Sequence, residues 1–340
     1  MREALLDLLL CPYCGGNNLR VETRVSGSTE IREGNVVCGK CEQARPVRGG
    51  IVDLLLDSLL AETYQPRKGK TGGECEGPGC ADGGNEPGVR VGATSDRVSK
   101  RCDLDRGWVE STTTDLDSCF PLLGLVRGMK VLEIGAGTCW ATSKFAEAGC
   151  ECVATDILVS KKLECADYWF KEEALYFERV LCPMERLYFK DGVFDMVFTC
   201  SALMYAGDLP QVLREIHRVL RPSGRLAICA EPVVGVTALA ARRRWKLEDS
   251  GNLYTLIQWK RALRSAHFTE VEVLFPHSVS RKLADPSRIS NRRSLHFWGA
   301  RVLSPLWKIE RFRSLMTRDL VEFWLLVTPV ASPFIAVARR

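Results

Sequence analysis

The feature that most constrains this chain is an apolar run ending in an acid and two glycines, Val131-Leu-Glu-Ile-Gly-Ala-Gly-Thr-Cys139. A second apolar run ends in Asp156, about 20 residues after the glycines, which is the spacing of a nucleotide-binding βαβ unit. Gly135 and Gly137 carry no Cβ, so the backbone there can turn sharply and approach a ligand. Asp156, at the end of the second strand, can accept hydrogen bonds from two ribose hydroxyls. The segment therefore predicts a nucleotide-type site in an α/β fold.

The number of glycines in this loop indicates which nucleotide cofactor it can bind. A dinucleotide fingerprint requires a third glycine where this chain has Trp140, so the loop argues against NAD and FAD. The order Glu133-x-Gly135-x-Gly137 instead resembles motif I of the class I S-adenosylmethionine (SAM) methyltransferases. The resemblance implies SAM as the cofactor and a methyltransferase as the enzyme class.

Later segments resemble the same family in the same order. Residues 194–198 resemble the fourth strand, and residues 209–220 have the apolar spacing of a helix, which Arg221-Pro-Ser-Gly224 should end. Residues 225–231 resemble the fifth strand. We expect a further helix at 256–266 and two last strands at 270–275 and 333–338. The predicted fold is a Rossmann-like, seven-stranded, doubly wound α/β sheet over residues 101–340.

The first 60 residues predict a separate metal-binding module. Two Cys-x-x-Cys pairs, Cys11 with Cys14 and Cys38 with Cys41, are separated by 23 residues and suit tetrahedral zinc. The flanking residues, 5–10 and 45–55, resemble the zinc-ribbon activator family whose members partner methyltransferases. The resemblance implies a structural zinc ribbon that stabilises or docks the enzyme, because no metal position is left open for chemistry.

Two other segments differ in composition. Residues 61–100 are rich in glycine and polar residues and predict a flexible linker, within which Cys75 and Cys80 have no assigned role. Residues 281–318 combine ten arginines and lysines with two acids and four aromatic residues, inside an expected insertion at about 280–325. Three interpretations stay open for 281–318: a solvated helical cap, a membrane surface or lipid-substrate contact, and nucleic-acid binding.

The methyltransferase resemblance also implies roles for individual residues. Glu133 would hold the amino-acid end of the cofactor, the loop would let the backbone approach it, and Asp156 would bind its ribose. The stretch from Cys182 to Glu185 would lie over the adenine, and the stretch from Cys200 to Tyr205 would line the methyl-donor cleft. Tyr205 is a candidate for either substrate contact or plain packing, and no other catalytic residue is assigned. The complete set of expected cofactor residues is Glu133, Gly135, Ala136, Gly137, Asp156, Ile157, Met184, Glu185 and Cys200.

Three functions remain compatible with the sequence. The first is SAM-dependent methyl transfer to a small-molecule or lipid-like acceptor. No Asn/Asp-Pro-Pro-aromatic motif follows the fourth strand, which favours an oxygen or carbon acceptor over an exocyclic amine. The second is an RNA or protein methyltransferase that docks through the ribbon. The third is a non-catalytic binding protein, because this chain departs from common family residues at Cys139, Pro183, Tyr188 and Tyr205.

Composition bears on the cellular location of such a protein. Apolar residues make up 46% and charged residues 26%, as in ordinary globular proteins. No secretion signal or membrane span is recognisable, and the fifteen cysteines fall largely on predicted strands, helices and metal knuckles. We expect a cytoplasmic protein, peripheral at the membrane if its acceptor is a lipid.

Overall fold

The computed structural model describes residues 1–26, 30–56, 106–158, 163–172, 174–234, 252–274, 301, 304–305, 308–309 and 332–340. The predicted linker at 61–100, with Cys75 and Cys80, lies outside the described residues, as does nearly all of 281–318. Within the described part of the chain, no helix is long and apolar enough to cross a bilayer.

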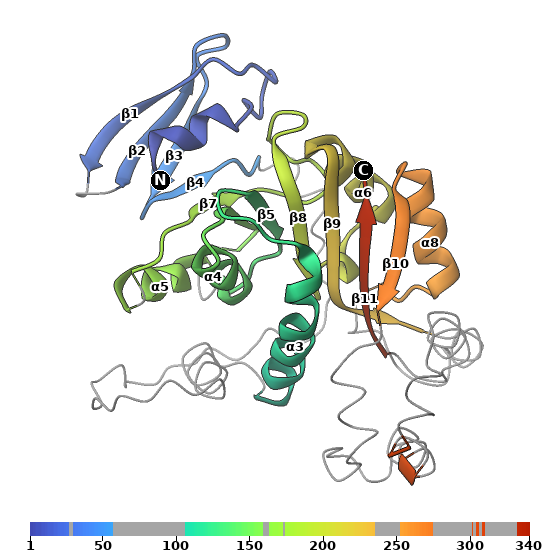
Figure 1. The fold of residues 1–340 in the computed structure, drawn as a ribbon. Coiled ribbons are helices and arrows are strands. Elements are labelled where there is room, and N and C mark those ends of the chain that lie inside the picture. The colour runs from blue at the N-terminus through green and yellow to red at the C-terminus, as the bar shows by residue number, and fades with distance from the viewer. Residues whose placement is uncertain are drawn as a thin grey trace, which may run out of the picture.

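In the part of the chain that the structure describes, one mixed sheet has eleven strands instead of the seven expected (Figure 1). Their order across the sheet is β1-β2-β3-β4-β7-β6-β5-β8-β9-β11-β10. The strands are β1 (Leu19–Ser26), β2 (Ile31–Cys38), β3 (Ala44–Arg48), β4 (Ile51–Asp53), β5 (Lys130–Ile134), β6 (Glu151–Asp156), β7 (Glu178–Leu181), β8 (Phe194–Cys200), β9 (Leu220–Val233), β10 (Thr269–Leu274) and β11 (Ser332–Arg339). The extra four strands come from the N-terminal module, defined here as residues 1–26 and 30–56, which continues the sheet instead of forming its own.

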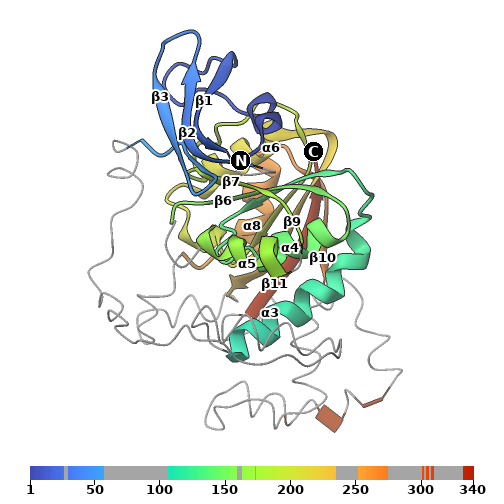
Figure 2. The ribbon, with the colours of Figure 1, turned by 90° about the vertical axis from the view of Figure 1, so that its left-hand side faces the viewer.

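Helices cover both faces of the strands that follow residue 130. Figure 2 shows one group on the near face and the other group behind the sheet. The first group is α3 (Arg106–Cys119), α4 (Trp140–Glu147) and α5 (Ala166–Glu172), and the second is α6 (Leu209–Val219) and α8 (Leu256–Ser265). Four 3₁₀ turns complete the described elements: η1 (Glu3–Asp7), η2 (Phe120–Leu123), η3 (Leu163–Cys165) and η4 (Leu203–Tyr205).

Local signals explain the helix on residues 209–219. Asp208 caps the helix by accepting a 3.0 Å hydrogen bond from the Gln211 amide, and a proline occupies its first turn, where no amide partner is needed. Val212, Leu213 and Ile216 are fully buried against the sheet. Helix α8 likewise begins at a capping box, in which Thr255 and Gln258 satisfy each other's backbone amides.

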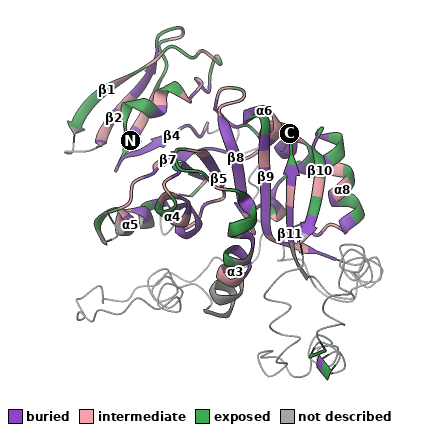
Figure 3. Ribbon diagram, viewed as in Figure 1, coloured by how far each residue is buried: buried purple, intermediate pink, exposed green. Residues whose placement is uncertain are grey.

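The central strands are buried on both faces, as parallel strands covered by helices must be (Figure 3). β7, β6, β5, β8 and β9 run parallel to one another, and β11 returns antiparallel to β9. Their registers align the carboxyl ends of β6, β5, β8 and β9 at a single edge of the sheet. In α/β sheets of this kind that edge is where ligands bind.

The N-terminal module joins this sheet through β4, which pairs in parallel with β7. Val52 lies opposite Val180, and beyond the strand the Leu54 amide donates to the Leu181 carbonyl at 3.0 Å. A second contact is the bridge between Leu9 and Phe189. The three-residue strand β4 thus covers what would otherwise be an open edge of the α/β sheet.

Four charged side chains close the same junction. Arg179 on β7 is almost fully buried and lies 3.0 Å from Asp167 on α5 and 3.7 Å from Glu30 of the module. Arg32 of the module contacts the same two acids, at 3.2 Å from Asp167 and 2.5 Å from Glu30. Each acid faces both arginines, and Glu30 also lies 3.4 Å from the N-terminal ammonium of Met1, so each of these charges has a partner of opposite sign.

Candidate functional site

The four cysteines predicted to bind metal come together in the structure. Their sulfur atoms all lie within 4.8 Å of one another, with Cys11 and Cys41 3.6 Å apart and Cys14 and Cys38 also 3.6 Å apart. A zinc ion with four thiolates at about 2.3 Å requires sulfur separations of about 3.8 Å. The cluster therefore fits a tetrahedral metal site.

Both cysteine pairs sit on the same kind of turn. The residue after the second cysteine donates to the carbonyl of the first, from Gly15 to Cys11 and from Glu42 to Cys38, both at 2.9 Å. Gly15 and Glu42 have positive φ angles of 67° and 61°. The glycine of the first turn was apparent in the sequence, but the left-handed Glu42 of the second was not.

The glycine loop and the acid predicted to hold the nucleotide also lie together. The Gly137 amide donates to one oxygen of Asp156 at 2.9 Å, and the amides of Ile157 and Leu158 donate to the other at 2.8 and 3.0 Å. Gly135 and Gly137 have φ angles of 68° and 54°, in the region that favours glycine. The carboxylate is thus held in place by three amides.

The loop also contains features that suit a polar ligand. The Thr138 hydroxyl is buried and has no hydrogen-bond partner among the described residues. A Cβ at Gly135 would overlap the Cβ of Ala202, so the loop packs directly against the turn after β8. A buried polar atom without a partner beside a glycine cradle is what a missing ligand would leave. The residues present therefore fit the SAM predicted here.

Glu133 occupies a different environment from Asp156. Its side chain is fully buried, and its carboxylate accepts a hydrogen bond from the Thr142 hydroxyl of α4. Burial raises the pKa of Glu133 to about 8. In this structure Glu133 therefore anchors α4 to β5, and its contact with a cofactor stays a prediction.

The remaining predicted residues are spread around the same edge. Ala136 donates its amide to the Thr155 carbonyl at 2.9 Å, and Met184 packs half-buried on the core. Glu185 accepts the Gly207 amide at 2.9 Å, which ties the loop after β7 to the turn after β8. Cys200 ends β8, and Tyr205 of the next turn is 65% exposed.

One residue at this edge was missed as a site residue. Glu231, near the end of β9, is fully buried, and it accepts hydrogen bonds from three consecutive amides of the turn after β8. The sequence did contain a signal, since a buried strand ends in an acid here as it does at Glu133 and Asp156.

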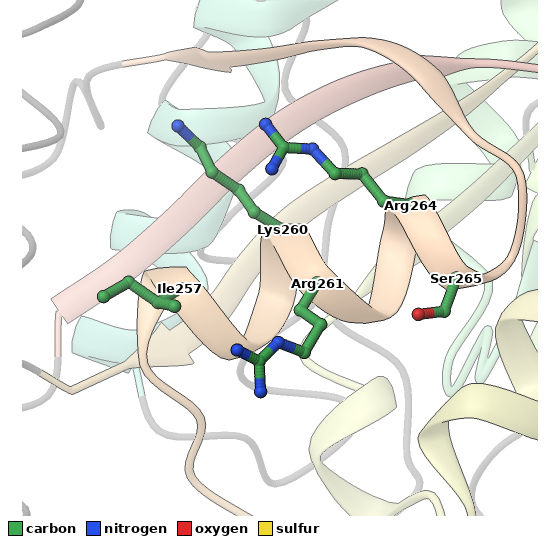
Figure 4. A pocket seen from close by; sticks show the side chains of 5 residues that line it. All are labelled: Ile257, Lys260, Arg261, Arg264 and Ser265. Atoms are coloured by element: carbon green, nitrogen blue, oxygen red, sulfur yellow. The ribbon is translucent and has the colours of Figure 1, made fainter.

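A hollow elsewhere on the described surface belongs to α8 alone. It measures about 480 Å³, and Figure 4 shows its lining side chains standing on the outer face of that helix: Ile257, Lys260, Arg261, Arg264 and Ser265. None of these residues comes from the strand ends, so this hollow is separate from the nucleotide-type site.

Comparisons with known proteins agree with the geometry at the strand ends. Residues 132–228 match the model of a family described as a methyltransferase domain. The chain is 34% identical over 148 residues to a demethylmenaquinone methyltransferase of Mycolicibacterium paratuberculosis, and 34% identical over 152 residues to that of Mycobacterium marinum. Each match covers 41% of this chain and 58% of the relative, so the chain spans little more than half the length of these relatives.

A solved structure also shares the fold. It is described as a complex between the Haloferax volcanii Trm112 methyltransferase activator and a proposed methyltransferase. The likeness has a TM-score of 0.50 at 15% identity and covers 74% of this chain and 99% of that one. The matches together support a class I, SAM-dependent methyltransferase domain with a Rossmann-like α/β fold in this chain.

Proposed function

We propose that this chain transfers a methyl group from SAM to a small lipid-like acceptor of the quinone class. The observation that carries the proposal is the clamp between the Gly137 amide and the Asp156 carboxylate, with Gly135 in a left-handed conformation beside it. SAM would supply the reactive methyl group. Asp156 would hold the ribose, while the glycine loop leaves room for the methionine part.

The acceptor class is suggested by the relatives. Those named above are demethylmenaquinone methyltransferases, and their names describe a methyl acceptor with a quinone ring. A neutral ring carbon or oxygen agrees with the absence of a motif for planar nitrogen after β8. Tyr205 stands exposed on the turn after β8, where it can contact such an acceptor.

The N-terminal module has a structural role in this proposal. Four thiolates from the protein would complete the coordination of zinc, so the metal would hold the fold of the module and take no part in methyl transfer. We propose the layout expected from the sequence, with a module at 1–60, a linker at 61–100 and a methyltransferase domain at 101–340. A lipid acceptor would place the protein at the cytoplasmic surface of the membrane.

Cofactor binding is the first test. Asp156→Ala removes the ribose acceptor, so we expect its SAM dissociation constant to rise at least about 30-fold, measured by titration calorimetry. Asp191→Ala is the control, because Asp191 is an exposed acid paired with Arg218. Unchanged affinity in Asp156→Ala, or no SAM binding by the wild-type protein at millimolar concentration, would remove the basis of the proposal.

Acceptor identity is the second test. The protein is incubated with membrane extract and methyl-labelled SAM, and the products are partitioned between organic solvent and water before mass spectrometry. Label in a quinone-containing organic fraction is expected. Label that is lost on ribonuclease or protease treatment would instead support an RNA or protein acceptor.

A further inference from the structure

The buried carboxylate of Glu231 accepts hydrogen bonds from three backbone amides of the turn after β8. Glu231 Oε1 accepts the amides of Ala202 and Leu203 at 2.7 and 2.8 Å, and Oε2 accepts the amide of Met204 at 3.1 Å. Glu231 has no solvent exposure, and no cation of the described residues forms an ion pair with it. Within the described part of the chain, three converging amides compensate its charge, in the manner of an anion-binding nest.

The backbone is shaped to allow this arrangement. β8 and β9 make their last pair at Cys200 and Cys229, and each strand then enters a left-handed residue. These residues are Ser201, with φ of 50°, and Ala230, with φ of 55°. The Ser201 hydroxyl donates to the Ala230 carbonyl at 3.0 Å. Left-handed non-glycine residues persist only where their surroundings enforce them, and they gather at functional sites.

The other side of the turn is tied as well. Asn252 donates its side-chain amide to the Ala206 carbonyl at 2.7 Å and its backbone amide to the Met204 carbonyl at 2.6 Å. Ala202 packs against Gly135 of the glycine loop. The turn is thus held by contacts with Glu231, with Asn252 and with Gly135 of the proposed cofactor loop.

We propose that Glu231 is a positioning residue for methyl transfer, whose ionised carboxylate holds residues 201–205 against the glycine loop. This rests on the proposed function, in which the turn lies between the glycine loop that would bind SAM and the methyl acceptor. Glu231 does not reach the reacting atoms. It acts through Ala202, which contacts Gly135, and through Tyr205, which stands exposed at the end of the same turn.

The electrostatics make the arrangement sensitive to pH. Burial raises the pKa of Glu231 to about 7, while the three amides act in the opposite direction. The titratable group that senses the Glu231 charge is the Cys200 thiol on β8, which also senses Glu133. The amides favour the ionised carboxylate, so release of the turn while Glu231 stays buried would raise its pKa further. The released state then binds the proton more tightly than the clamped state, and the turn should loosen as the pH falls below about 7.

Hydrogen exchange tests the arrangement without requiring activity. In the wild-type protein, exchange at residues 202–204, corrected for the intrinsic rate, should be slow at pH 8.5 and at least tenfold faster at pH 6. Glu231→Gln should show the fast rate at both pH values. Glu178→Gln is the matched control: Glu178 is a half-buried glutamate with a raised pKa that accepts a backbone amide, from Arg2, but it lies at the start of β7.

Kinetics connect the turn to the reaction. Glu231→Gln should lower kcat for methyl transfer at least tenfold, keep the SAM dissociation constant within about threefold, and abolish the acid limb of the kcat profile. Glu178→Gln should keep all three properties. Glu231→Gln with wild-type exchange, or with wild-type kcat and pH profile in an active enzyme, would overturn the positioning role.

The two proposals fail in different ways. If the wild-type protein transfers no methyl group but its exchange shows the expected pH dependence, the clamp stands and the proposed function falls. If Glu231→Gln does not fold, the wild-type exchange profile alone decides, since pH-independent protection at residues 202–204 would overturn the role of the carboxylate.

Discussion

The N-terminal module and the α/β domain keep their shape by different means. The module has three antiparallel pairings and four thiols clustered around one point, and most of its buried apolar side chains join the core of the α/β domain. The α/β domain buries strands such as β8 on both faces between two layers of helices. A segment of about 50 residues buries too little surface to be stable alone, so the shared sheet, and the zinc proposed here, would supply the stability that a larger core supplies elsewhere.

The largest expected difference between the two regions concerns metal. Cys14→Ser removes one of the four thiols proposed to bind zinc, and structural zinc contributes on the order of 10 kcal/mol to folding. We expect this variant to lose its zinc, measured by elemental mass spectrometry, and β1–β3 to lose protection from hydrogen exchange. Cys152→Ala removes a buried thiol of the α/β domain and should keep full zinc content. Full zinc content in Cys14→Ser would refute the site.

The junction should respond less strongly but still severely. Arg179→Met leaves Glu30 and Asp167 with one arginine in place of two. Because Arg32 and Asp167 are each about one-third exposed, we expect a loss of about 3 kcal/mol of the free energy of unfolding, the low end of the range for a broken buried pair. Urea unfolding followed by circular dichroism measures this loss. Arg20→Met, at an exposed pair with Glu22, should cost less than about 0.5 kcal/mol. Equal losses in the two variants would show that the network adds nothing.

The smallest expected difference between the two regions is in the stability cost of replacing one glycine in each by alanine. Gly135 in the α/β domain and Gly49 in the module both have positive φ, 68° and 57°. A Cβ at Gly135 would overlap Ala202, whereas a Cβ at Gly49 would meet nothing within 4 Å. Gly135→Ala should therefore cost about 3 kcal/mol, from strain and overlap, and Gly49→Ala about 1 kcal/mol, from strain alone. Thermal unfolding of both variants measures this, and equal costs would mean that the turn after β8 yields easily.

The sequence was most informative where a motif has a local cause. The order of acid, glycines and second acid predicted the proximity of Gly137 and Asp156, because the strand register leaves the carboxyl ends little freedom. The spacing of Cys11, Cys14, Cys38 and Cys41 likewise predicted the thiol cluster. Helix α6 begins at the predicted residue, since a cap and a proline mark it there.

Long-range contacts were less predictable, for physical reasons. β4 has three residues, too few for any periodicity, so its pairing with β7 and the eleven-strand sheet could not be predicted. The clamp at Glu231 depends on the left-handed Ala230, a conformation that no residue preference predicts for alanine. Both features arise from partners distant in the sequence.

The parallel pairing of β4 with β7 has a consequence for how the two regions depend on each other. A separate protein that docked at this edge would have to find it by diffusion and would leave it at a rate set by the strand pair, the bridge of Leu9 to Phe189 and the charged junction. On one chain the local concentration of the strand is on the order of millimolar, whatever the amount of protein in the cell. The junction can then stay assembled at any protein concentration, and cellular supply of a partner no longer limits how many molecules are assembled.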